Sequence, residues 1–443
     1  MNSRKLIIIT LLFAIILSAC GGANSGNNSK SDDISSGGSV DASGHVTLDF
    51  WYSLSGETGE VVETLVRQFN ETHPNITVTA TYQGNYSAIM AKVYSAITGG
   101  SLPNVAQLGG APLLGTSDAI LPMTDFTNGE NGLDLSLIRQ AFLDYNTIDG
   151  TLWSMPFNNS VPVMYYNKDL FAAAGLDPED PPENFDELID LAKQLTLDPN
   201  NTGLPVQYGV NSRDDTHWYF DAMMLGNGVK IVNDDLSEVL YNSPEAVEML
   251  TLWGDLVKKY KVMPPNQHAE AQTDFLAGKL AILFGSSASV NTLSKSTSFK
   301  LGVTMFPAID NNERSLPLGG GSMVIFKNDN EAIRDASWEF VKYMTSKESS
   351  LYMTQNTGYL PIYNDAFAWS EIQQLILDEP VRKAAIQSLD YAYAIPVFSA
   401  LGNSDLALRQ AIEKVELGVA EPADALNSAV LSVNRAIKEQ FSK

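Results

Sequence analysis

The sequence predicts an α/β protein of two lobes, and two observations lead to this prediction. Apolar and polar side chains alternate over residues 46–51 and 76–82, as in β-strands, and an apolar stripe of helical spacing lies between them. A strand, a helix and a second strand in this order usually build a parallel sheet. About 400 residues follow His45, which is more than one ordinary hydrophobic core holds, so we expect two lobes.

The N-terminal residues predict a bacterial lipoprotein signal. Cys20 is the single cysteine of the chain, and it follows a basic start, the apolar run 6–17 and the small residues Ser18 and Ala19. The apolar run is shorter than the roughly 20 residues that a transmembrane helix needs. We therefore expect residues 1–19 to be removed and Cys20 to carry a lipid. An ordinary cleaved signal with a chance cysteine is the alternative.

A polar segment follows over residues 20–44. It has almost no apolar side chain that could offset the entropy of ordering, so we expect a flexible tether and a folded part that begins near His45. The formal net charge of −24 argues against binding to nucleic acid or to anionic lipid surfaces. The lipid on Cys20 is then the expected attachment to the membrane, from an extracytoplasmic position, and two or more acyl chains would hold it firmly.

The later elements follow from apolar spacing and from helix start signals. Asn184 with Glu187 resembles a capping box, and Ser243-Pro244 is typical of a helix start. Apolar residues of helical spacing predict helices over residues 61–69, 185–195, 246–257, 333–344 and 423–441. Short apolar runs predict buried strands over residues 161–166, 280–284 and 323–326.

Motifs for catalysis or metal binding are scarce. The four histidines are scattered without a ligand spacing, and the sequence has no GxxxxGK[ST] loop, no GxGxxG after a strand and no GxSxG. The segment 198–203 resembles the start of a calcium loop, but Gly209 stands where a glutamate is needed. The glycine run 319–321 precedes an apolar strand and predicts a close backbone approach or a bend. We expect no metal and no cofactor, although a catalytic carboxylate pair could arise by chance among 52 acidic residues.

Aromatic and small polar residues gather in the expected loops, among them Trp51-Tyr52, Asn158–Ser160 and Trp218-Tyr219. Aromatic rings pack against the C–H faces of polyols, and hydroxyl and amide groups form hydrogen bonds with polyol OH groups. A single aromatic residue is more often part of a core. Their joint placement favours a cleft for a polar small molecule.

Several short segments, in collinear order from about residue 46 to the C-terminus, resemble the extracellular solute-binding proteins of carbohydrate-type ABC importers. These segments are residues 50–53, 69–74, 82–86, 156–160, 165–169, 174–178 and 357–361. The resemblance implies the type II periplasmic-binding-protein fold, in which hinge crossings join two lobes. It places the crossings near residues 157–160, 305–318 and 359–361. The implied lobes are residues 45–158 plus 306–359 and residues 159–305 plus 360–443.

Within the family, residues 82–86 and 156–160 are most similar to members that bind sn-glycerol-3-phosphate. This similarity implies ligand contacts from Tyr86, Ser160, Trp218, Ser286, Gly320, Tyr359 and Arg409. Two departures leave the solute open. Residues 107–111 lack the acidic residue that these members have there. The arginine with which these members face the phosphate aligns equally well with Arg409 and with Asp405. Arg409 is more simply interpreted as an exposed helix residue. A sugar, another polyol or a glycerophosphodiester are therefore alternatives.

The resemblance also implies capture without catalysis. A small solute would enter the open cleft, bonds to both lobes would stabilise the closed form, and the closed protein would dock on a membrane permease whose ATPase drives import. We expect a monomer that needs no cofactor. The alternatives from other classes are a lipid-anchored glycan-processing enzyme and a surface adhesion lipoprotein.

Overall fold

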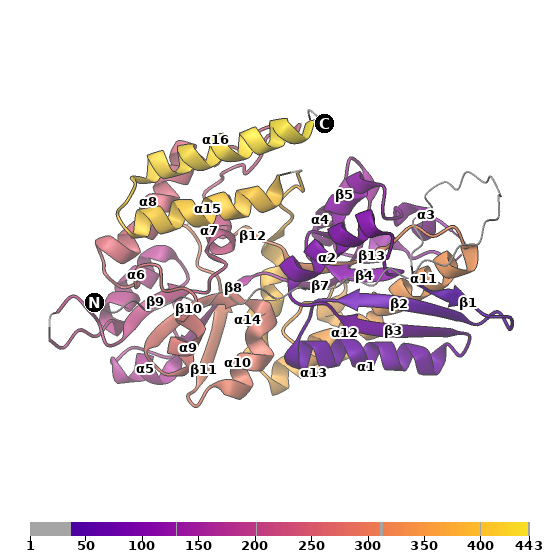
Figure 1. Ribbon diagram of the computed structural model, residues 1–443. Coiled ribbons are helices and arrows are strands. Elements are labelled where there is room, and N and C mark those ends of the chain that lie inside the picture. The colour runs from indigo at the N-terminus through magenta and orange to yellow at the C-terminus, as the bar shows by residue number, and fades with distance from the viewer. Residues whose placement is uncertain (1–36, 130, 201, 311–312, 399, 442–443) are drawn as a thin grey trace, which may run out of the picture. The chain divides into compact units, whose positions relative to one another are not determined.

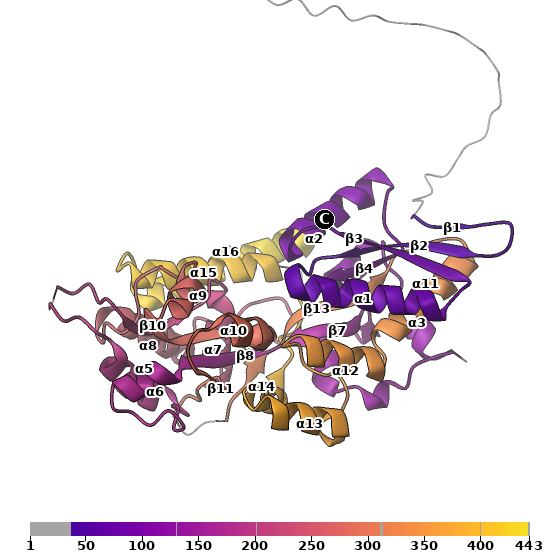
Figure 2. The same cartoon turned by 90° about the horizontal axis from the view of Figure 1, so that it is seen from below.

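The protein is built around two β-sheets, one of six strands and one of four (Figure 1). The computed structural model describes residues 37–129, 131–200, 202–310, 313–398 and 400–441. The predicted signal and Cys20 lie outside these residues. Figures 1 and 2 show helices packed on both sheets, with α15 (Leu401–Glu416) and α16 (Pro422–Phe441) side by side in the part that holds the four-stranded sheet.

The six-stranded sheet contains the βαβ unit that the sequence predicts. Strands β2 (Val46–Tyr52) and β3 (Ile76–Tyr82) pair in parallel, and α1 (Gly56–Thr72) connects them with its apolar stripe buried. Every second residue of β2 is buried, as the alternation predicts. The sheet has the order β1-β2-β4-β13-β7, with β3 beside β2; the other strands are β1 (Ser39–Val40), β4 (Val105–Leu108), β7 (Met155–Ser160) and β13 (Gly319–Ile325).

The folded part begins earlier than the sequence indicated. Ser39 and Val40 pair with β2, whereas the tether was expected to reach residue 44. The Asp41 carboxylate accepts hydrogen bonds from the backbone N–H groups of Ser43 and His45, and these bonds close the turn before β2. A local hydrogen-bonded turn therefore adds this polar segment to the sheet edge without an apolar core of its own.

The four-stranded sheet has the order β11-β8-β10-β9. Strands β8 (Pro162–Asn167) and β10 (Leu280–Ser286) are almost wholly buried, which confirms the strands predicted from the apolar runs. β10 pairs in parallel with β9 (Tyr208–Ser212) and antiparallel with β8, while β11 (Leu301–Met305) pairs antiparallel with β8. Strands covered on both faces have this continuous apolar character.

The predicted helix starts are confirmed. Asn184 caps α6 (Phe185–Leu195) by accepting a hydrogen bond from the Glu187 N–H, and Ser243 caps α8 (Pro244–Lys258) in the same way. The remaining helices are α2 (Tyr86–Gly99), α3 (Thr124–Thr127), α4 (Gln140–Tyr145), α5 (Lys168–Ala173), α7 (Thr216–Gly226), α9 (Ala271–Leu276), α10 (Val290–Ser296), α11 (Glu331–Met344), α12 (Lys347–Asn356), α13 (Ser370–Asp378) and α14 (Arg382–Gln387). Two small ribbons pair β5 (Thr147–Ile148) with β6 (Thr151–Leu152) and β12 (Leu316–Pro317) with β14 (Ala392–Tyr393).

The chain passes between the two sheets after β7 and again after β11. It leaves β7 at Ser160 and enters β8 at Pro162, and it leaves β11 at Met305 and reaches β13 at Gly319. Leu360 donates a backbone hydrogen bond to Asn159 beside the first connection. After this contact α13 packs on α12, and α14 packs on β11. The lobe limits given above stay a prediction.

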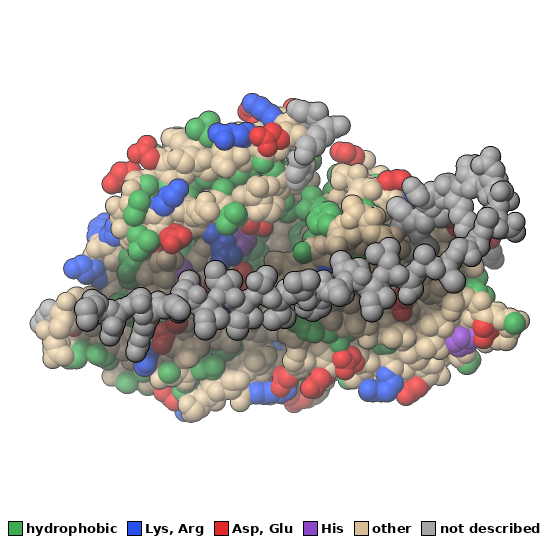
Figure 3. All heavy atoms as spheres, in the orientation of Figure 1, with side chains coloured by type: hydrophobic (Ala, Val, Ile, Leu, Met, Phe, Trp, Pro, Cys, Tyr) green, Lys and Arg blue, Asp and Glu red, His purple; other side chains and the backbone are tan. Residues whose placement is uncertain are grey.

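The described surface carries charges of both signs. On the face shown in Figure 3, Lys and Arg side chains lie interspersed with Asp and Glu side chains. Among the helices of the described residues, none is both long and apolar enough to span a membrane.

Candidate ligand-binding site

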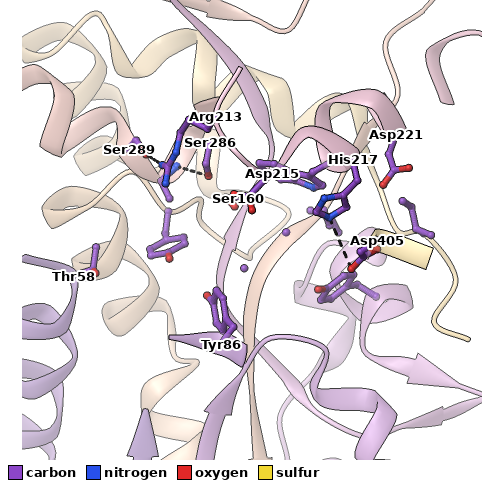
Figure 4. A pocket seen from close by; sticks show the side chains of 18 of the residues that line it. Thr58, Tyr86, Ser160, Arg213, Asp215, His217, Asp221, Ser286, Ser289 and Asp405 are labelled. Atoms are coloured by element: carbon purple, nitrogen blue, oxygen red, sulfur yellow. Dashed lines mark hydrogen bonds and ion pairs between the residues drawn. The ribbon is translucent and has the colours of Figure 1, made fainter. Parts of the chain in front are cut away.

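A cleft of about 580 Å³ lies where strands of both sheets end (Figure 4). This volume is within the range of roughly 300–1,000 Å³ that is usual for small-molecule sites. Six of the residues singled out from the sequence line it: Tyr86, Ser160, Trp218, Ser286, Gly320 and Tyr359. The fold therefore brings together residues that are far apart in the chain. Their contact with a ligand stays a prediction.

The ends of regular elements place these side chains. Ser160 is the last residue of β7 and Ser286 is the last residue of β10, so each sheet supplies one hydroxyl group. Tyr86 opens α2, and Trp218 lies in the first turn of α7. Functional side chains often gather at such ends because a rigid element holds them while the following loop leaves them accessible.

The glycine run at the start of β13 makes room for the cleft wall. Gly320 has a φ of +100°, and a Cβ atom there would lie 1.9 Å from the carbonyl oxygen of Asn158. A Cβ atom at Gly319 would lie 2.7 Å from the Trp218 ring. The strand register shifts directly after Gly321. The predicted close backbone approach is confirmed, and only glycine tolerates it at position 320.

A buried hydrogen-bonded chain holds Tyr86 from behind. Gln107 Oε1 accepts from the backbone N–H and the hydroxyl group of Ser53, and Gln107 Nε2 donates to Asn158 Oδ1. Asn158 Nδ2 donates to the Tyr86 hydroxyl oxygen over 2.8 Å. Burial raises the pKa of the Tyr86 and Tyr359 hydroxyl groups, so both tyrosines keep their protons at neutral pH. Gln107 itself is fully buried and does not line the cleft.

Arg213 supplies a positive charge to the cleft. It follows β9 directly, and its Nη1 donates a hydrogen bond of 3.0 Å to the Ser289 hydroxyl group. Ser286 lies at the same end of the cleft, as Figure 4 shows. A guanidinium group beside hydroxyl groups can bind a phosphate or several polyol oxygens.

Acidic residues line another part of the same cleft. Asp221 is buried on α7, and Asp405 on α15 lies with its Oδ2 3.8 Å from His217 Nε2. Burial, together with the charge of Asp405, raises the pKa of Asp221 well above its usual range. Burial lowers the pKa of His217, although Asp405 opposes this shift, so the imidazole is neutral at neutral pH. Among the described residues, no group of three or more His, Cys, Asp or Glu side chains could hold a metal ion.

Three polar atoms of α7 are buried without a hydrogen-bond partner in the described part of the chain. They are Nδ1 of His217, Nε1 of Trp218 and Oδ1 of Asp221, and all three residues line the cleft. We refer to them as the orphan atoms. Buried polar atoms in native proteins nearly always have a partner. The cleft wall formed by α7 therefore holds hydrogen-bonding capacity that the described residues do not use.

Arg409 lies outside this cleft. It is exposed on α15 and lines a neighbouring pocket of about 220 Å³ with His268 and Glu413. Asp405, the other residue that matched the same family position, lines the cleft. The exposed position of Arg409 agrees with the simpler interpretation of this residue, and the arginine within the cleft is Arg213.

The model of the family described as bacterial extracellular solute-binding protein matches residues 64–377. The chain belongs to this family. The sn-glycerol-3-phosphate-binding periplasmic protein UgpB of Pectobacterium atrosepticum is 28% identical over 428 residues, which cover 91% of this chain and 95% of the relative. The solved cyclic alpha-maltosyl-1,6-maltose binding protein of Arthrobacter globiformis has a TM-score of 0.78 and 24% identity, covering 89% of this chain and 100% of its own. UgpB from Mycobacterium tuberculosis in complex with glycerophosphocholine has a TM-score of 0.78 and 20% identity, covering 89% and 99%.

These comparisons confirm the predicted family and the type II periplasmic-binding-protein fold of two lobes. As a member of this family, the chain is an extracytoplasmic solute-binding protein of ABC importers and not an enzyme. The resemblance to sn-glycerol-3-phosphate-binding proteins is confirmed across most of the chain.

Sequence reasoning missed several residues of this solute-binding cleft. Arg213, Asp215, His217 and Asp221 line it, yet none of them was proposed as a site residue. They follow β9 or lie early in α7, so a polar cluster after a buried strand was the available signal. The parallel pairing of β9 with β10, which places that cluster beside Ser286, could not be predicted from local patterns.

Proposed function

We propose that this protein captures a sugar, polyol or glycerol-phosphate-type solute in the cleft and delivers it to an ABC permease and its ATPase. The polar side chains of the cleft wall support the proposal best, because Ser160, Arg213 and Ser286 offer hydrogen bonds to a solute rich in hydroxyl or phosphate oxygens. Ser160 from one sheet and Ser286 from the other both line the cleft. With the lobes taken as residues 45–158 plus 306–359 and residues 159–305 plus 360–443, a solute bound to Tyr86 of the first lobe and Ser286 of the second would favour their closed arrangement.

The charges of the cleft favour a glycerophosphodiester within this class. Arg213 is the single lysine or arginine among the residues described as lining the cleft, and Asp215, Asp221 and Asp405 line it too. A phosphate monoester carries about 1.5–2 negative charges near neutral pH, which the carboxylates of Asp215 and Asp405 would repel. A phosphodiester carries one negative charge for Arg213, and its hydroxyl-bearing or cationic groups suit the aspartates. The Mycobacterium tuberculosis relative was solved with such a compound, glycerophosphocholine.

A neutral sugar is the second candidate. Aspartates accept hydrogen bonds from sugar hydroxyl groups, and the Trp218 ring lies in the cleft wall where a sugar face could stack. The Arthrobacter globiformis protein is named for binding a maltosyl-maltose. The same cleft would then recognise hydroxyl groups at Arg213 in place of a phosphate.

A thermal-shift screen with sn-glycerol-3-phosphate, glycerophosphocholine, glycerol and maltose tests the proposal, because binding to the folded state raises the melting temperature. The largest shift is expected with glycerophosphocholine. A shift with maltose alone would contradict a phosphodiester as the solute but would agree with the role in an importer. No shift with any of the four compounds would contradict the proposed solute class.

Substitution of the two arginines then locates the anionic group. Arg213→Ala should weaken glycerophosphocholine binding roughly 10- to 150-fold, the usual effect of losing a charged hydrogen bond. Arg409→Ala tests the contact that the sequence implied, and the exposed Arg435 supplies a matched control. Equal losses in Arg213→Ala and Arg435→Ala, measured by titration calorimetry, would contradict a direct role of Arg213.

We further propose that a lipid on Cys20 holds a monomer at the membrane. Cys20→Ser should move the protein from the membrane fraction to the soluble fraction, since the lipid is the expected attachment. Retention of the variant in the membrane fraction would contradict this anchor. Size-exclusion chromatography of the detergent-solubilised protein tests the monomer.

A further inference from the structure

Two buried amides connect the backbone of Ser53 to the hydroxyl group of Tyr86, and one end of this connection has a fixed polarity. The Ser53 backbone N–H can only donate, so the Gln107 atom that faces it, 2.9 Å away, is the oxygen Oε1. Gln107 Nε2 then faces Asn158 and donates to Oδ1 over 2.9 Å. Asn158 Nδ2 is thereby left to donate to the Tyr86 oxygen.

Neither amide can turn over without loss. Gln107 and Asn158 are both fully buried, and a reversed amide would place two donors or two acceptors against each other. Gly321 leaves the space that the Gln107 amide occupies, since a Cβ atom there would lie 2.2 Å from Nε2. The direction set at Ser53 therefore passes through both amides to Tyr86.

We propose that Gln107 and Asn158 are positioning residues that make the paired hydroxyl groups of Tyr86 and Tyr359 a hydrogen-bond donor toward the cleft; this rests on the solute-binding function proposed above. A phenol has one proton, and Asn158 already donates to its oxygen, so the proton points away from Asn158. The hydroxyl group of Tyr359 lies near that of Tyr86, and Tyr359 also lines the cleft. If Tyr86 donates its proton to Tyr359, the proton of Tyr359 is left for the solute; if it does not, the Tyr86 proton is left.

The consequence concerns solute specificity. At this point of the cleft the protein offers a donor and so selects a solute oxygen that accepts, such as a phosphate, ether or carbonyl oxygen. Gln107 does not line the cleft, so any effect of its polarity on the solute passes through Asn158 and Tyr86.

Gln107→Glu should reverse the direction of the Asn158 amide, although residue 107 does not line the cleft. One carboxylate oxygen of the variant still accepts from Ser53, while the other needs a donor and turns Asn158 Nδ2 toward itself. Asn158 Oδ1 then faces Tyr86, whose proton turns away from the solute. Affinity for glycerophosphocholine should fall roughly three- to ten-fold, the effect of one lost hydrogen bond.

A double-mutant cycle with Tyr86→Phe separates this relay from a general effect of charge or structure. Without the hydroxyl group, Gln107→Glu should change the affinity by less than about twofold. Ser53→Ala is the matched control, because it removes one bond to Gln107 but keeps the N–H that sets the direction. Equal losses from Gln107→Glu in both backgrounds would overturn the proposal. If Gln107→Glu does not fold, Asn158→Asp takes its place, since aspartate accepts from both Gln107 and Tyr86.

Neutron diffraction on the solute-free protein tests the relay without any ligand. We expect the Tyr86 deuteron to point away from Asn158, and one Nδ2 deuteron of Asn158 to point at the Tyr86 oxygen. A Tyr86 deuteron directed at Asn158 would overturn the proposal. If the wild type binds none of the four compounds, the proposed function fails, while the neutron map still decides the direction of the relay.

Discussion

Replacing Asp221 with asparagine should stabilise the solute-free protein at neutral pH. Asp221 lines the cleft, 5% of its surface is exposed, and its Oδ1 has no hydrogen-bond partner among the described residues. Burial and the nearby Asp405 raise the pKa of Asp221 well above its usual range. Asparagine keeps the shape and removes the charge, so the cost of a desolvated carboxyl group disappears.

The size of the effect follows from this burial. The proton that the folded protein keeps and the unfolded chain releases costs about 1.4 kcal/mol for each pH unit above the unfolded pKa of about 3.9, and therefore at most about 4 kcal/mol at pH 7. An unfolding entropy of roughly 2.1 cal/mol/K per residue amounts to about 0.8 kcal/mol/K for a folded part of about 400 residues. Asp221→Asn should therefore raise the Tm by up to about 5 °C at neutral pH.

The dependence on pH has a definite sign. Because the folded-state pKa is raised, the folded protein keeps a proton at Asp221 that the unfolded chain releases. The stability of the wild type therefore falls as the pH rises from about 3.9, the unfolded value, to the raised folded value. Asparagine has no such dependence. Scanning calorimetry should show a Tm difference near zero at about pH 4 that grows as the pH rises.

A difference that does not change with pH, or a lower Tm of the variant at neutral pH, would refute this reasoning. Asp235→Asn provides a control of opposite sign. Asp235 is exposed and accepts hydrogen bonds from Ser237, which lower its pKa. Its substitution should remove a little stability at all pH values above about 4, and this loss should fade as the pH falls through the lowered folded pKa.

Three further substitutions test the packing around the cleft and the core. Gly320→Ala should lower the free energy of unfolding by about 3 kcal/mol or more and the Tm by about 4 °C, because the new Cβ atom would collide with Asn158 at a left-handed φ. Gly402→Ala, where the Cβ atom meets open space, should not lower the Tm. Glu416→Ala should lower the free energy of unfolding, measured in urea, by about 3–5 kcal/mol, because this buried carboxylate accepts a hydrogen bond from Trp253 Nε1 over 2.6 Å and pairs with His268. An equal loss in Glu413→Ala, on the exposed face of the same helix, would contradict this account. Glu57→Gln breaks an exposed ion pair of 3.0 Å with Lys295 and should shift the Tm by less than about 1 °C, and a shift of several degrees would refute this account.

Local elements were predictable because their signals lie within a few residues. The alternation in β2 and the Asn184 and Ser243 caps depend on neighbours in the chain, and each appears in the structure. The start of the folded part was misjudged, because β1 depends on a turn at Asp41 and on pairing with β2. The composition of the segment carries no sign of that pairing.

The cleft was predictable only in part. Tyr86, Ser160 and Tyr359 could be picked out because they belong to recognisable segments of the family. Arg213 and Asp221 belong to no recognisable motif. They reach the cleft because β9 pairs with β10 and because α7 follows β9 in the chain.

The sequence by itself determined the strand and helix periods, the family and six of the residues on the cleft wall, because these depend on residue order. The lipoprotein signal stays a prediction. The tertiary structure decided which charges share the cleft, which polar atoms are orphaned, and in which direction the amides behind Tyr86 point. These properties depend on desolvation and on contacts between distant segments. They therefore exist only once both sheets are in place.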